Sequence, residues 1–111
     1  MIITPIRLLT IPTLALLSAC AQSPDAIAPV SMGNAFAAMT CQDARNELTA
    51  ESATLAALSA AQQSAVTGDV IGVVLIGVPT SSLMGGDKAG LIAFSKGKII
   101  ALQLRLAGCG Q

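Results

Sequence analysis

Apolar positions recur at helical spacing over two long stretches of the chain, and these stretches predict its fold. Over 41–66, steps of three and four residues give a seam of small and leucine side chains that only Glu51 and Gln62 interrupt. The stretch has no Gly or Pro and is rich in residues that favour helices. Thr40 stands where an N-cap would satisfy the first free amide groups. The pattern predicts an amphipathic helix.

The second periodic stretch covers residues 87–107. Counting back from Cys109 in steps of three and four gives one apolar stripe, and a second stripe lies beside it. An apolar arc this broad predicts a helix buried against two neighbours, the first helix and the apolar run 70–78. Gly90 and Gly97 weaken the prediction, since a glycine inside a helix costs about 1 kcal/mol relative to alanine.

The segment between the two stretches can be interpreted in two ways. Gly68-Asp69 indicates a break after the first helix, and the uncharged run 70–78 ends before Pro79. This run is too short to span a membrane, and its β-branched content suits a strand as well as a buried helix. One fold is therefore an antiparallel helical hairpin with an apolar connecting segment. The alternative is a small α+β unit with strands near 70–78 and 99–106, where the sequence also alternates.

The beginning of the chain carries a targeting signal. A short apolar run follows Arg7 and ends in Leu17-Ser18-Ala19-Cys20. This ending resembles the lipobox of bacterial lipoproteins, in which the chain is cut before the cysteine. The resemblance implies that residues 1–19 are a signal peptide and that Cys20 carries the lipid. Ala21 at the next position favours the outer membrane over the inner one, by similarity to enterobacterial sorting.

An envelope location changes how the other two cysteines are interpreted. In an oxidising compartment, Cys41 and Cys109 are expected to form a disulfide. An antiparallel hairpin would bring them together, since the first helix starts where the second one ends. We therefore favour the hairpin over the α+β unit. Residues 20–39 are then expected to be a flexible tether, and residues 40–111 a small disulfide-closed helical domain.

The composition of the chain argues against several kinds of function. The chain has no His, Trp or Tyr, and once residues 1–19 are removed five cations stand against six acids, a net charge of −1. We expect no nucleic-acid binding, no cofactor, no metal site and no catalytic residues. Asp43, Glu47 and Glu51 recur at steps of four and are interpreted as a solvated stripe.

These features predict a lipid-anchored, periplasm-facing envelope lipoprotein with a structural or adaptor role. Its partners would be the membrane, through the lipid on Cys20, and an envelope protein or a second copy of the chain. The alternative is a small membrane-acting lipoprotein that uses the apolar segment 70–78.

Overall fold

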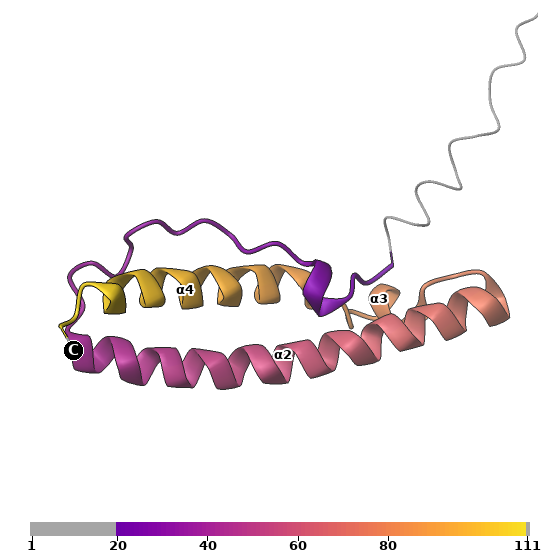
Figure 1. Cartoon of the computed structure of the whole chain (residues 1–111). Coiled ribbons are helices and arrows are strands. Elements are labelled where there is room, and N and C mark those ends of the chain that lie inside the picture. Colours follow the sequence, from indigo (N-terminus) through magenta and orange to yellow (C-terminus); the bar gives the residue numbers. More distant parts are fainter. Residues whose placement is uncertain (1–19, 111) are drawn as a thin grey trace, which may run out of the picture.

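The computed structural model describes residues 20–110, which form a long helical hairpin (Figure 1). Helix α2 (Cys41–Ile76) runs antiparallel to α4 (Ala89–Ala107), and the short helix α3 (Thr80–Leu83) lies between them in the chain. A single 3₁₀ turn, η1 (Pro24–Ala26), precedes them. The described part of the chain contains no strand. The prediction of a mainly helical hairpin is confirmed, and the α+β alternative is wrong.

The predicted seams form the contact between α2 and α4. Every seam position on both helices is buried or half-buried, which is what an apolar stripe facing one partner helix requires. Thr40 is the N-cap of α2, and its hydroxyl accepts the amide hydrogen of Asp43 at 3.1 Å. The seam of α2 comprises Ala44, Leu48, Glu51, Leu55, Leu58, Gln62 and Ala65, and that of α4 comprises Ile92, Ser95, Ile99, Leu102 and Leu106.

Helix α2 continues past the break expected at Gly68-Asp69 and ends at Ile76. The glycines inside it serve close packing, because a Cβ at Gly68 would overlap the hydroxyl of Ser81 and one at Gly72 would lie 2.5 Å from the Val78 carbonyl oxygen. α3 therefore packs directly on the backbone of α2. The helix stops at Gly77, whose left-handed φ of 78° is the usual conformation at a helix C-terminus. The run 70–76 is thus the last two turns of α2.

Residues 21–39, which we call the strap, lie along α4 and do not hang free as a tether (Figure 1). The Val30 amide donates to the Ala93 carbonyl at 2.9 Å, and the Lys96 ammonium donates to two carbonyls around η1. Arg105 donates to the Met39 carbonyl at 2.7 Å. The strap, and not the run 70–78, is therefore the second neighbour of α4.

The disulfide between Cys41 and Cys109 closes one end of the hairpin, with the two Cα atoms 6.0 Å apart. It joins the first residue of α2 to the segment just after α4, as the antiparallel arrangement predicts. We call this the closed end. The opposite end, where α2 passes into α3, is called the distal end.

Candidate functional site

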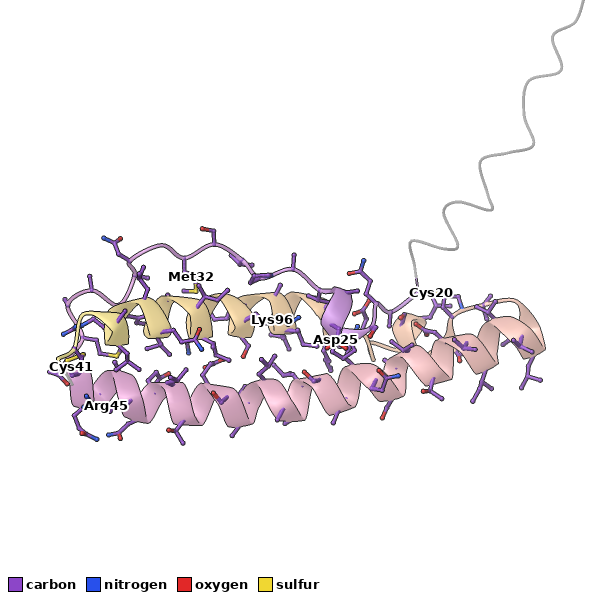
Figure 2. The ribbon with its side chains drawn as sticks, in the orientation of Figure 1. Cys20, Asp25, Met32, Cys41, Arg45 and Lys96 are labelled. Atoms are coloured by element: carbon purple, nitrogen blue, oxygen red, sulfur yellow. A yellow bond between two sulfur atoms is a disulfide. The ribbon has the colours of Figure 1, made fainter. Side chains whose placement is uncertain are left out.

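Cys20 lies at the distal end, beside α3 and far along the hairpin from the disulfide (Figure 2). It is half-buried, and the residues directly after it are bound to α2. The predicted site residues thus fall into two places, with the cysteine pair at the closed end and Cys20 at the distal end. The chemistry around Cys20 comes from four polar side chains that we call the polar clamp: Gln62, Asp69, Ser82 and Asp87.

Asp69 is the centre of the polar clamp. Only 1% of its surface is exposed, yet its carboxylate has several donors. One oxygen accepts the backbone amide hydrogen of Ala21 at 2.6 Å and the hydroxyl hydrogen of Ser82, and the other accepts the Ser82 amide hydrogen at 2.8 Å. A buried carboxylate needs such partners, since an unpaired charge in the interior is costly. Asp69 therefore ties the residue after Cys20 to both α2 and α3.

The pKa of Asp69 reflects this environment. Burial acts to raise the pKa, because it disfavours the charged form. The hydrogen bonds from Ser82, Ala21 and the backbone of Ser81 favour the charged form and outweigh burial, so the pKa of Asp69 lies below its ordinary value. The carboxylate is consequently ionised at neutral pH, and each of its bonds is a charge-assisted one.

Gln62 lies two helical turns before Asp69 on the same face of α2 and is fully buried. Its amide nitrogen donates to the Gln22 carbonyl at 2.8 Å and to Asp87 at 3.0 Å, and its oxygen accepts the Lys88 amide hydrogen at 2.6 Å. The hydrogen-bonding groups of the side chain are thus used for other segments of the chain. Gln62 and Asp69 together fix the two residues that follow Cys20 and the start of α4.

Asp87 stands close to the start of α4. The helix begins at Ala89, and Asp87 accepts the amide hydrogen of that residue at 2.9 Å. The same oxygen accepts from Gln62. The side chain thereby links the N-terminus of α4 to the seam of α2.

A second polar contact lies on the seam, between the clamp and the disulfide. The Lys98 ammonium donates to Glu51 at 2.8 Å and to Glu47 at 3.2 Å. Only 8% of Glu51 is exposed, so the interpretation of this residue as part of a solvated stripe is wrong. Burial acts to raise the pKa of Glu51, but the bond from Lys98 outweighs it and lowers the pKa. A specific ion pair therefore fixes the register of the two helices.

The end of α2 beyond the clamp is covered with exposed apolar side chains, and we call this region the apolar tip. Val74, Leu75 and Met84 are 77%, 74% and 87% exposed. The tip comprises Val70, Ile71, Val73, Val74, Leu75, Ile76, Leu83 and Met84. Residues 70–86 carry no charge. None of the helices in residues 20–110 is long and apolar enough to cross a membrane.

The sequence contains a signal for the clamp, which becomes visible only when the first helix is extended past residue 66. Asp69 follows Ala65 by four residues and precedes Gly72 by three, so it falls on the seam once α2 is extended. A charged residue on an apolar seam indicates a buried partner. Lys96 and Arg105 gave no such signal, because lysine and arginine are ordinary on a helix surface.

No known family matches this chain. Comparison with protein-family models, with curated proteins and with solved structures found no match in any of the three. Described residues also include no group of three or more His, Cys, Asp or Glu side chains that could hold a metal ion.

Proposed function

We propose that this chain is a lipid-anchored lipoprotein of the bacterial envelope whose helical hairpin has a structural or adaptor role. The observation that carries the proposal is the polar clamp on the residues next to Cys20. Asp69 and Gln62 bind the backbone of Ala21 and Gln22, both of which follow the predicted cleavage position. A lipid on Cys20 would thus be joined rigidly to the hairpin, with no loose linker between them.

The rigid attachment suits a protein that presents a surface at a defined place. Two long antiparallel helices, one disulfide and one part-buried ion pair resist bending and separation of the hairpin. Two acyl chains or more hold a protein stably on a bilayer, whereas one chain does so only marginally. A triacylated Cys20 would keep the hairpin on the periplasmic face of the membrane, and the resemblance to a lipobox favours the outer membrane.

Intact mass tests the anchor and the disulfide together. The protein is extracted from membranes of the producing bacterium and measured with alkylation, before and after reduction. We expect a chain that begins at a triacylated Cys20 and gains two alkyl groups only after reduction. A Cys20→Ser variant is the control and should leave the membrane fraction. A wild-type mass without lipid would refute the anchor, whatever the state of the disulfide.

The adaptor role needs a separate test on the outer face of α2. A photo-crosslinking residue is placed at exposed Arg45 or Thr49, near the closed end, and the cells are irradiated. We expect a discrete adduct, either with one envelope protein or with a second copy of the chain. The same residue placed at buried Ala44 should give none. If no exposed position of α2 yields an adduct, the adaptor role is wrong even where Cys20 is lipidated.

A further inference from the structure

We infer that the apolar tip is a membrane-docking surface, which inserts into the leaflet that holds the lipid on Cys20. The inference rests on the proposed lipid anchor and adds a second point of attachment to it. It concerns residues 70–84, which the anchor itself does not require.

Exposed apolar side chains surround the last two turns of α2. A soluble surface helix keeps apolar residues on one stripe, while a helix that is apolar on all sides is normally buried. In the last two turns of α2, only the Gly72 position is covered by α3. The other residues of these turns point in all directions around the helix and are exposed and apolar. Figure 1 shows this end of α2 projecting beyond the start of α4, so α4 does not cover it.

The position of Cys20 beside the tip points to the bilayer as what covers the tip. The clamp places Ala21 on Asp69, directly before the first residue of the tip, so a lipid on Cys20 and the tip emerge at the same end. With Cys20 at the headgroup level, the seven residues after Asp69 would extend about 10 Å further at 1.5 Å per residue. Amphipathic segments at membrane surfaces are typically buried by roughly 5–10 Å. The tip therefore has the reach of an interfacial segment of one leaflet.

The tip carries no charged side chain. No charged residue occurs between Asp69, whose buried carboxylate is hydrogen-bonded within the clamp, and Asp87, which binds Gln62 and α4. Insertion of residues 70–84 thus requires no desolvation of a charge. The polar groups of the connecting segment are partly satisfied as well, since the Gly77 amide donates to the Val73 carbonyl and Thr80 donates to the Gly68 carbonyl.

The test uses the chain from residue 20 onward with Cys20→Ser, which retains both helices, the strap and the disulfide. Binding to vesicles of phosphatidylethanolamine and phosphatidylglycerol is measured by flotation. We expect the lipid-free chain to bind, and Leu75→Asp to weaken partitioning by at least about tenfold, as the loss of one buried leucine predicts. Leu104→Asp is the control, since Leu104 is an exposed leucine on α4 near the closed end (57% exposed, against 74% for Leu75), and this variant should bind like the parent chain.

Helical content and thermal unfolding are measured for all three chains to test for a folding defect. Because Leu75 is exposed, we expect neither quantity to change in Leu75→Asp. Failure of the parent chain to bind vesicles, or equal binding by Leu75→Asp, would overturn the inference while leaving the lipid on Cys20 untouched. Sedimentation of the same chains tests the other occupant. A dimer that Leu75→Asp dissociates, without vesicle binding by the parent, would assign the tip to a second copy of the chain and refute docking on lipid.

Discussion

Replacing Asp69 with asparagine tests whether the polar clamp holds the residue after Cys20. The substitution keeps the shape of the side chain but turns one oxygen into an NH₂ group. If that group faces Ala21, the Ala21 amide loses its acceptor; if it faces the other way, the Ser82 amide does. In either orientation one buried backbone donor is left facing another donor. The serine hydroxyl can rotate to accept, but a backbone amide cannot.

The expected loss of stability in Asp69→Asn follows from the kind of hydrogen bond that is lost. A hydrogen bond to a charged group contributes about 1.5–3 kcal/mol, and an unsatisfied buried donor costs a similar amount. We therefore expect Asp69→Asn to lower the free energy of unfolding by about 2–3 kcal/mol. The assay is urea unfolding of the chain from residue 20 with Cys20→Ser, followed by circular dichroism at neutral pH. Asp43→Asn removes a charge from the exposed start of the same helix and should cost less than about 1 kcal/mol.

The pH dependence supplies a second check. Because the folded-state pKa of Asp69 is lowered, its contribution is complete above the unfolded pKa of about 3.9 and is lost as the pH falls through the folded value. The difference between the parent chain and Asp69→Asn should accordingly shrink in strong acid. Equal stability of the two chains at pH 7, or a difference that does not change with acid, would refute the role of the charged clamp.

Three further predictions concern the rest of the hairpin. Reduction of the disulfide, with a sequence separation of 68 residues, should lower stability by about 4 kcal/mol on the chain-entropy model, as measured by urea unfolding with and without reductant. Gly97→Ala should release the strap, because a Cβ there would overlap the Val30 carbonyl, and faster hydrogen exchange of the Val30 amide would report the release. In Gly90→Ala the new Cβ would contact no other atom, so this variant should instead stabilise the chain by about 0.5–1 kcal/mol. Glu51→Gln should cost about 1–3 kcal/mol in the same unfolding assay, since Lys98 loses the negative charge of its 2.8 Å partner. A stability equal to that of the parent would contradict this role.

The helical hairpin could be predicted because its signal is periodic. The seams of α2 and α4 repeat over several turns, and the register that pairs them also brings Cys41 to Cys109. The residue at which α2 ends could not be predicted from this periodicity. Gly68-Asp69 has the local character of a helix break, and what overrides it is tertiary: α3 needs glycine at its point of contact, and the Ser82 and Ala21 donors need the carboxylate.

The path of the strap could not be predicted from the sequence, for a different reason. Residues 21–39 show no period, and their contacts with α4 are made largely by their own backbone carbonyls with Lys96 and Arg105. Backbone groups are the same at every position, so the sequence of the strap does not encode where they bind. The glycine at position 97, which lets the Val30 backbone approach α4, marks the course of the strap in the sequence of α4.

Charge is distributed unevenly along the hairpin. Asp43, Arg45 and Glu47 lie in the first two turns of α2, whereas residues 70–86 have no charge. With Cys20 anchored and the tip in the bilayer, the charged closed end would face water. At 1.5 Å per residue, Cys41 would stand about 40 Å from Asp69 along α2. A partner of the adaptor would therefore be met at the closed end, well above the membrane surface, and the disulfide would keep that end intact in an oxidising compartment.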